Sequence, residues 1–173
     1  MKENQKKGKV YAITSGKGGV GKTSIAVNLS IALSNAGLRV LLIDADMGLA
    51  SVDLLTGVSA RHTIEEVING EVNIFEALAD GPENLTILSA GSGTGRVAES
   101  GEENAGRFRR ELQKLENAFD LIFIDTGAGI SANVVDFAFL AEEVIVVMTP
   151  EPTAFADAYA MVKVVTLEKP RMQ

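Results

Sequence analysis

The residues from Gly16 to Thr23 read Gly-Lys-Gly-Gly-Val-Gly-Lys-Thr, and their types and spacing point to phosphate chemistry. They match the phosphate-loop pattern G-x-x-x-x-G-K-[ST] at every fixed position. Glycines let such a loop turn successive backbone N–H groups toward one point, and the start of the following helix also favours an anion there. The sequence therefore predicts a site for the phosphates of a nucleotide.

The side chains of this loop have separate expected tasks. Lys22 is expected to reach the β- and γ-phosphates, and the Thr23 hydroxyl is expected to bind Mg²⁺. The general pattern does not require Lys17, which is either a solvated loop lysine or one that reaches a phosphate bound by a second copy of the chain. The residues expected to bind the nucleotide are Gly16, Lys17, Gly18, Gly19, Val20, Gly21, Lys22, Thr23 and Ser24.

Three aspartates end apolar runs that are typical of buried strands. Asp44 and Asp46 end one run, and Asp125 ends a second. Because ligand chemistry in parallel sheets gathers at the carboxyl ends of strands, we expect all three near the phosphate loop. Asp125 is a candidate ligand of Mg²⁺ or of its water. One of Asp44 and Asp46 would belong to the metal shell and the other would orient an attacking water. A single strand-end aspartate is more often a helix cap or a turn former.

Apolar runs and helical patterns alternate along the chain, which predicts an α/β fold with a mostly parallel sheet flanked by helices. Gly37 is expected to end the first helix, and Thr63 is expected to open the second with a capping box. The glycine-rich stretch 90–106 is expected to be a surface loop. Strands are expected near 9–14, 39–43, 85–88, 120–124 and 143–148, and helices near 22–36, 63–69, 73–80, 103–118, 131–140 and 153–167.

Composition narrows the class of protein. The chain has 173 residues, a net charge of −7 and no cysteine, so disulfides and thiolate metal sites are excluded. No apolar stretch approaches the ~20 residues of a membrane span, and the basic start lacks the apolar core of a signal peptide. These features predict a cytoplasmic protein. The negative charge argues against a broad nucleic-acid surface.

Residues 15–23 resemble the deviant Walker A motif of the MinD/ParA ATPases. Within that family the chain is most similar to the FlhG type, also called FleN or YlxH, through residues 42–57, 125–134 and 151–163. The resemblance extends from about residue 9 to about residue 166. It implies a three-layer P-loop NTPase fold that binds ATP and Mg²⁺ and hydrolyses ATP to ADP and phosphate.

The resemblance also implies a role for each candidate residue. Lys17 would act across an ATP-dependent homodimer, and Lys22 would be the lysine of the phosphate loop itself. Asp46 would orient the hydrolytic water, with Asp44 near the metal shell. Residues 46–53 and 125–129 would form the two switch segments.

Family members are longer than this chain, so residues 1–173 are expected to be a single MinD-like ATPase domain that lacks the usual C-terminal portion. That portion normally supplies further strands, the residues that hold adenine and, in the MinD and FlhG branches, an amphipathic membrane-binding helix. Residues 166–173 are too few for such a helix, which argues against membrane binding. The cytoplasm and the face of the inner membrane both stay open as locations.

The resemblance implies a regulator of flagellar number or placement, with the FlhF GTPase or flagellar basal-body proteins as partners. The segment Met1–Lys9 lacks the Asp-Gln-Ala sequence with which FlhG proteins stimulate FlhF. Two other functions stay open. One is a ParA-type chromosome or plasmid partition ATPase, which needs a basic surface for DNA. The other is a nucleotide-binding module without hydrolysis.

Overall fold

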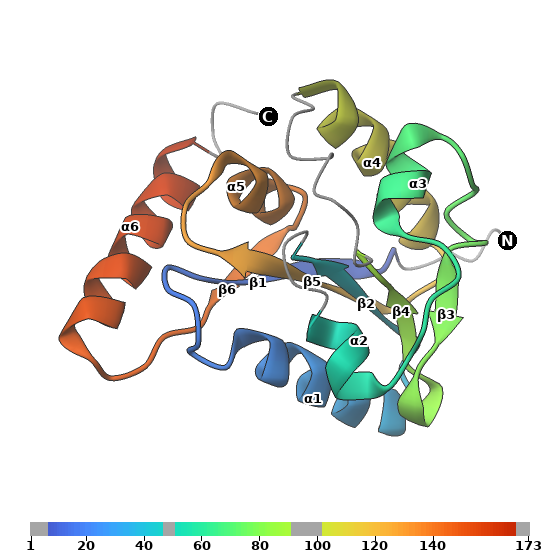
Figure 1. The fold of residues 1–173 in the computed structure, drawn as a ribbon, viewed down its shortest axis with the longest axis horizontal. Coiled ribbons are helices and arrows are strands. Elements are labelled where there is room, and N and C mark those ends of the chain that lie inside the picture. Colours follow the sequence, from blue (N-terminus) through green and yellow to red (C-terminus); the bar gives the residue numbers. More distant parts are fainter. Residues whose placement is uncertain (1–6, 47–50, 91–101, 169–173) are drawn as a thin grey trace, which may run out of the picture.

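A six-stranded sheet forms the centre of the computed structural model, which describes residues 7–46, 51–90 and 102–168 (Figure 1). The strand order is β3-β4-β2-β5-β1-β6, and only the β3–β4 pair is antiparallel. The strands are β1 (Lys9–Ser15), β2 (Val40–Ala45), β3 (Leu78–Asp80), β4 (Thr86–Leu88), β5 (Leu121–Ala128) and β6 (Glu143–Val146). The helices are α1 (Lys22–Asn35), α2 (Ser51–Thr56), α3 (Ile64–Asn69), α4 (Glu102–Leu115), α5 (Ala132–Phe139) and α6 (Pro152–Glu168), with a short 3-10 helix η1 (Pro82–Asn84).

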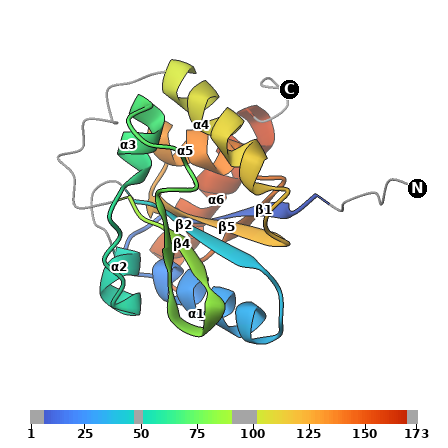
Figure 2. The same cartoon turned by 90° about the vertical axis from the view of Figure 1, so that its right-hand side faces the viewer.

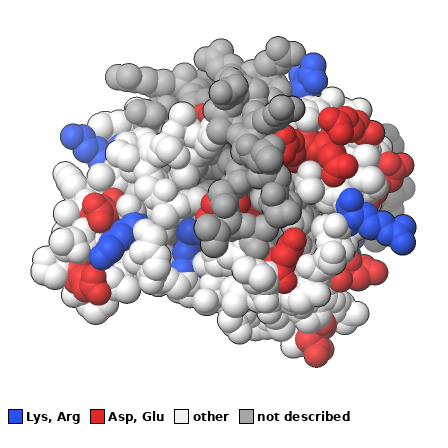
Figure 3. All heavy atoms as spheres, viewed as in Figure 1, with Lys and Arg blue, Asp and Glu red and all other residues white. Residues whose placement is uncertain are grey.

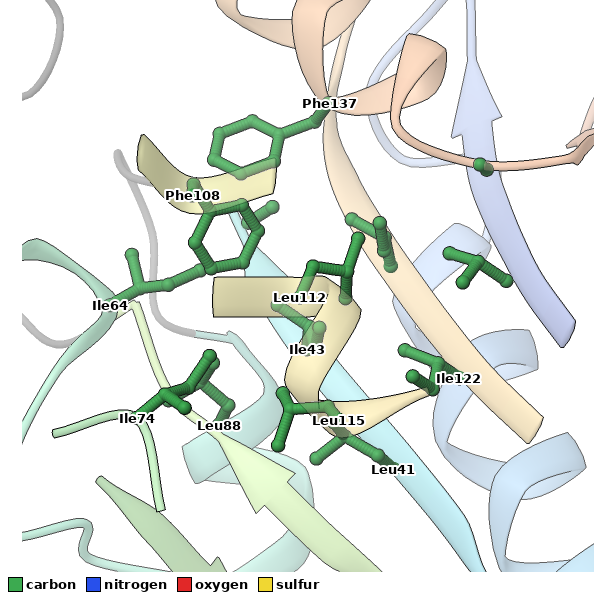
Figure 4. Close-up of a cluster of buried hydrophobic side chains, with 14 of the residues drawn as sticks. Leu41, Ile43, Ile64, Ile74, Leu88, Phe108, Leu112, Leu115, Ile122 and Phe137 are labelled. Atoms are coloured by element: carbon green, nitrogen blue, oxygen red, sulfur yellow. The ribbon is translucent and has the colours of Figure 1, made fainter. Parts of the chain in front are cut away.

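Helices cover both faces of the sheet, as Figure 2 shows from the side. Successive residues of a strand point to opposite faces, so the central strands supply apolar side chains to two cores. In β2, Leu41 and Ile43 pack with the helices α3, α4 and α5, whereas Val40 and Leu42 pack on the side of α1. Figure 4 shows the first of these cores. The predicted three-layer α/β architecture with a mostly parallel sheet is confirmed.

The sheet brings the carboxyl ends of its three central strands together. β1 lies between β5 and β6, and β2 pairs with β5 on the other side. Asp44 of β2 is in register with Asp125 of β5, and Ile13 of β1 is the partner of Asp125 on its other side. The two strand-end aspartates therefore meet beside the loop that follows β1, as the sequence predicted.

One predicted helix is wrong. Residues 73–80 carry a helical apolar spacing, but Asn73–Ala77 form a tight turn and the residues after it form strand β3. Leu78 pairs with Leu88 of β4, and the N–H of Gly81 donates to the carbonyl of Leu85 at 2.7 Å to close the hairpin. Pairing with the sheet edge outweighs a local helical preference over so few residues.

Other boundaries differ less. Gly37 follows the last turn of α1 with φ 92°, and Thr63 and Glu66 form the predicted capping box of α3. Helix α2 was not predicted. Most of the stretch 90–106 lies outside the described residues. Residues 102–106 belong to α4, in agreement with the helix predicted near 103–118 and not with the loop predicted to extend to 106. No described helix has the length and apolar character needed to cross a bilayer.

Candidate nucleotide site

The loop from Gly16 to Gly21 leaves the end of β1 and leads directly into α1. Gly19 and Gly21 adopt φ angles of 77° and 88°, which side chains with a Cβ rarely tolerate. Gly21 is the N-cap of α1, and its carbonyl accepts the first helical hydrogen bond from the N–H of Ile25 at 2.9 Å. The glycines therefore bring the start of α1, where backbone N–H groups lack partners within the helix, to the carboxyl edge of the sheet.

Helix α6 packs directly on the first residue of this loop. A Cβ placed on Gly16 would lie 2.2 Å from the backbone carbonyl of Asp157, closer than any real contact. Only glycine lets α6 approach so closely. The contact between α6 and Gly16 was not predicted. The phosphate-loop pattern by itself accounts for a glycine at this position, so nothing in the sequence indicated that a distant helix packs on it.

A cavity of about 420 Å³ opens at the mouth of the loop. Seven of the predicted residues line it, namely Gly18, Gly19, Gly21, Lys22, Thr23, Ser24 and Asp46. Three further residues, Ser15, Ser51 and Ala128, also line it. Ser51 and Ala128 belong to the two predicted switch segments, but none of the three was predicted individually to bind the nucleotide or the metal. The other predicted residues, Gly16, Lys17, Val20, Asp44 and Asp125, are not part of this lining. The phosphate loop and Asp46 thus share one cavity, with Asp44 and Asp125 beneath it at the strand ends.

Lys22 and Asp125 form a buried ion pair under the loop. The Lys22 Nζ donates to Oδ1 of Asp125 at 2.7 Å, and the two side chains are 7% and 0% exposed. Burial raises the pKa of Asp125, and the Lys22 ammonium opposes that rise. The second oxygen of Asp125, Oδ2, is buried without a hydrogen bond of ordinary length from the described residues. Asp125 thus has an oxygen that can accept a further ligand.

The Asp44 carboxylate accepts hydrogen bonds from two backbone N–H groups near the cavity. Its Oδ1 accepts the N–H of Asp46 at 3.0 Å, and its Oδ2 accepts the N–H of Val52 at 3.2 Å. The side chain is fully buried, and this burial raises its pKa to about 7, although the two backbone hydrogen bonds lower it. Asp125, its neighbour across the sheet, adds to the rise.

The pKa of Asp44 predicts a pH-dependent stability for the nucleotide-free chain. Because the folded value of about 7 lies above the ordinary 3.8, the folded state binds the proton more tightly. The free energy of unfolding should therefore decrease as the pH rises from 3.8 to about 7, and this group should contribute at most about 4 kcal/mol to the decrease. Urea unfolding at about pH 4.5 and about pH 7.5 should show a smaller decrease for Asp44→Asn than for the unaltered chain.

Asp120→Asn is the control for this measurement. Its exposed carboxylate pairs with Arg39, which lowers its pKa, so its contribution is lost only below the ordinary value and outside the measured window. Equal decreases in the unaltered chain and in Asp44→Asn would contradict the assignment to Asp44.

Asp46 lies where it can face a group bound in the cavity. It follows β2 directly, and a Cβ placed on Gly127 would lie 3.8 Å from Oδ1 of Asp46. Gly127 belongs to the end of β5, so the two predicted switch segments meet here. Residues 47–50 of the first switch segment lie outside the described residues.

The groups beneath the loop suit a magnesium ion. The Thr23 hydroxyl lies 3.4 Å from that of Ser51 and also interacts with the Asp125 carboxylate, whose Oδ2 adds a further oxygen donor. Among the described residues, no group of three His, Asp or Glu side chains is placed to hold a metal alone. A Mg²⁺ ion here would take its remaining ligands from phosphate and water, as Mg²⁺ commonly does with nucleotides.

Lys17 lies outside the cavity, at the surface. Its Nζ donates to Oε2 of Glu151, just before α6, at 3.2 Å, and the two side chains are 44% and 59% exposed. On the face drawn in Figure 3, the basic side chains of the described residues lie apart from one another, and several have acidic neighbours. The prediction that the chain does not bind nucleic acid stays a prediction.

Comparison with known proteins places this site in a family. Residues 8–172 match the family described as an AAA domain. The chain is 41% identical over 154 residues to the antiactivator FleN of Pseudomonas aeruginosa, covering 89% of this chain and 55% of FleN. It is 38% identical over 163 residues to the flagellum site-determining protein YlxH of Helicobacter pylori, covering 94% of this chain and 55% of YlxH.

Solved structures agree with the sequence matches. The septum site-determining protein MinD of Pyrococcus horikoshii, complexed with Mg-ADP, superposes with a TM-score of 0.82 at 29% identity, covering 91% of this chain and 65% of that chain. The chain spans about half the length of the curated relatives that it matches. The predicted resemblance is confirmed, and the chain belongs to the AAA-domain family as a MinD/ParA-type P-loop protein close to FleN and YlxH.

Proposed function

We propose that this chain binds Mg-ATP through the loop 16–23 and hydrolyses it to ADP and phosphate. The observation that carries the proposal is the cavity of about 420 Å³, which the loop, Thr23 and Asp46 line together. The related MinD of Pyrococcus horikoshii was solved with Mg-ADP, and the match covers 91% of the present chain. The site thus combines a phosphate cradle, metal-binding oxygens and a carboxylate for the attacking water.

Each side chain has a task that its position allows. Lys22 would exchange Asp125 for the β- and γ-phosphates, which frees the Asp125 carboxylate for the metal or for its water. Thr23 would hold the metal from the start of α1. Asp46 would orient the attacking water beside Gly127, where the two strand ends meet. A bound Mg²⁺ ion supplies neutralisation of the charge that develops on the phosphate oxygens.

The dimer and its biological use are the finer part of the proposal. Lys17 is exposed and outside its own cavity, so a second copy facing it would receive this lysine at its bound γ-phosphate. We propose that the ATP-bound dimer regulates flagellar number or placement, because the relative YlxH is named a flagellum site-determining protein. The FlhF GTPase or basal-body proteins would be its partners.

The flagellar role is tested in the organism that carries the gene. Deletion of the gene should change the number or position of flagella and leave the division septum in place, and an allele with Lys22→Ala should behave like the deletion. A displaced septum with normal flagella would instead support a role in septum placement, which is the role that the name of the MinD relative describes.

Affinity should depend on the phosphates more than on the base. The residues lining the cavity are small or suited to phosphate and metal, and none of them is aromatic. In calorimetric titrations with Mg²⁺, ATP and GTP should therefore differ less than tenfold in affinity, or about 1.4 kcal/mol. Adenosine should bind undetectably, and inorganic tripolyphosphate should compete with ATP. Strong discrimination for adenine would contradict this prediction, and no binding of any nucleotide would contradict the proposed function itself.

A further inference from the structure

The short helix α2 depends on polar contacts for its position. It has six residues, far fewer than an isolated helix needs to be stable in water. Val52 is its one buried side chain, whereas Leu54 and Leu55 are 81% and 53% exposed. Val52 packs against α1, and because one valine gives little apolar anchoring, the hydrogen bonds of this helix also contribute to its orientation.

Among the described residues, three polar contacts join α2 to the sheet and to α1, and two of them reach the nucleotide site. The N–H of Val52 donates to Oδ2 of Asp44 at 3.2 Å, and the Ser51 hydroxyl lies 3.4 Å from that of Thr23. The third contact lies away from the cavity. There the Ser89 hydroxyl donates to Oδ2 of Asp53 at 2.8 Å.

Ser89 lies at the carboxyl end of β4, inside the sheet. It follows β4 directly and is fully buried, and its carbonyl accepts the N–H of Ile64 at 2.8 Å. The preceding residue, Leu88, pairs with Ile43 of β2, so Ser89 lies beside the strand end that carries Asp44. The Asp53–Ser89 hydrogen bond therefore joins α2 to the same edge of the sheet that holds the metal-shell aspartate.

The Asp53 carboxylate shows what this bond must do. Its other oxygen, Oδ1, is buried and has no hydrogen-bond partner among the described residues. A buried carboxylate oxygen without a partner is destabilising. The bond to Ser89 is the side-chain hydrogen bond that joins Asp53, and with it α2, to the sheet.

We propose that Asp53 is a positioning residue for the hydrolytic step. Through Ser89 it fixes α2, and α2 donates the Val52 N–H that holds one oxygen of Asp44, whose other oxygen accepts the N–H of Asp46 at 3.0 Å. A shift of α2 would thus displace the carboxylate that orients water but leave the phosphate loop in place. This inference rests on the proposed ATP hydrolysis.

The test separates turnover from binding. Asp53→Ala and Ser89→Ala should each lower kcat about tenfold while KM and the affinity for Mg-ADP change less than threefold, because the loop keeps its contacts. The double variant should be no slower than either single variant, since both remove the same bond. Asp53→Asn keeps an acceptor for the Ser89 hydroxyl and should recover most of kcat.

Thr56→Val is the matched control. It removes a hydrogen bond of 2.8 Å inside α2, from the Thr56 hydroxyl to the Val52 carbonyl, without touching the sheet. Its kcat should match the unaltered chain. An Asp53→Ala variant that keeps full kcat, or that loses Mg-ADP affinity as much as kcat, would overturn the proposal.

Hydrogen exchange on the nucleotide-free protein gives a second readout that does not require hydrolysis. The amides of residues 51–56 should exchange faster in Asp53→Ala and Ser89→Ala than in Thr56→Val, while those of α1 stay unchanged. If the unaltered chain does not hydrolyse ATP, the proposed function fails, yet this comparison still decides whether Asp53 and Ser89 hold α2. Unchanged exchange at residues 51–56 would overturn the inference on its own.

Discussion

Replacing Lys22 with alanine is expected to lower the affinity for Mg-ATP about a hundredfold, or ~3 kcal/mol. The variant loses the ammonium that would form charge-assisted hydrogen bonds with the β- and γ-phosphates, and the backbone N–H groups of the loop stay in place. Calorimetric titration with Mg-ATP measures the loss. Lys163→Ala is the matched control, because it removes the same atoms from an exposed position on α6. Unchanged affinity in folded Lys22→Ala would contradict the assignment of the phosphate loop.

A loss of fold must be separated from a loss of contact. In the nucleotide-free chain Lys22 pairs with buried Asp125, and removing one partner of such a pair typically costs ~3–5 kcal/mol of stability. The cost should be smaller here at low pH, since the raised pKa of Asp125 already favours its neutral form. The double variant Lys22→Ala, Asp125→Asn should recover stability without recovering binding, and urea unfolding beside the titration tests both.

The phosphate loop and the strands beside it could be predicted from the sequence because their signals are local. A glycine pattern between a buried apolar run and a helical run leaves one arrangement, and the β1-loop-α1 unit follows it. Asp44 and Asp125 were also predictable as neighbours, because buried runs of similar length end at both residues and parallel strands align their ends.

The rest could not be predicted, because the determining contacts are distant in sequence. Residues 73–80 form a turn and an edge strand, since β4 offers a pairing partner that no local pattern reveals. The Asp53–Ser89 bond spans 36 residues, and the Lys17–Glu151 pair spans 134. Helix α2 has only six residues, which is too few for a recognisable helical pattern. The family resemblance implied a switch segment there, but nothing in the sequence predicted the helix that contacts Asp44.

In the single chain, Lys17 pairs with Glu151 at the surface. The pair is exposed, and exposed ion pairs are typically worth less than ~1 kcal/mol, so it holds the lysine only weakly in the single chain. A γ-phosphate in the cavity of a facing copy would offer the same ammonium a site with more negative charge and less water, where the interaction is stronger. Breaking the intramolecular pair is therefore a small cost for dimerisation.

We expect ATP, but not ADP, to shift the chain toward a dimer, and we expect Lys17→Ala to abolish this shift. Loss of the lysine should raise the dimer dissociation constant at least tenfold, or about 1.4 kcal/mol. Asp46→Ala should do the reverse. Without the carboxylate that orients water, hydrolysis should fall about a hundredfold while the ATP dimer persists. Sedimentation of the unaltered chain and both variants, with ADP and with a non-hydrolysable ATP analogue, measures these shifts.

Association through the sheet edge is the competing explanation for any dimer. Among the described strands β6 pairs only with β1, and an open strand edge can join two chains without nucleotide. Such a dimer would form equally with ADP and would survive Lys17→Ala. Either result would show that the interface is not the one in which Lys17 reaches the partner's phosphate.

Lys163→Ala, which removes an exposed lysine from α6, should leave the ATP-dependent shift unchanged. Loss of the shift in that control would mean that general surface charge, rather than Lys17, drives the pairing.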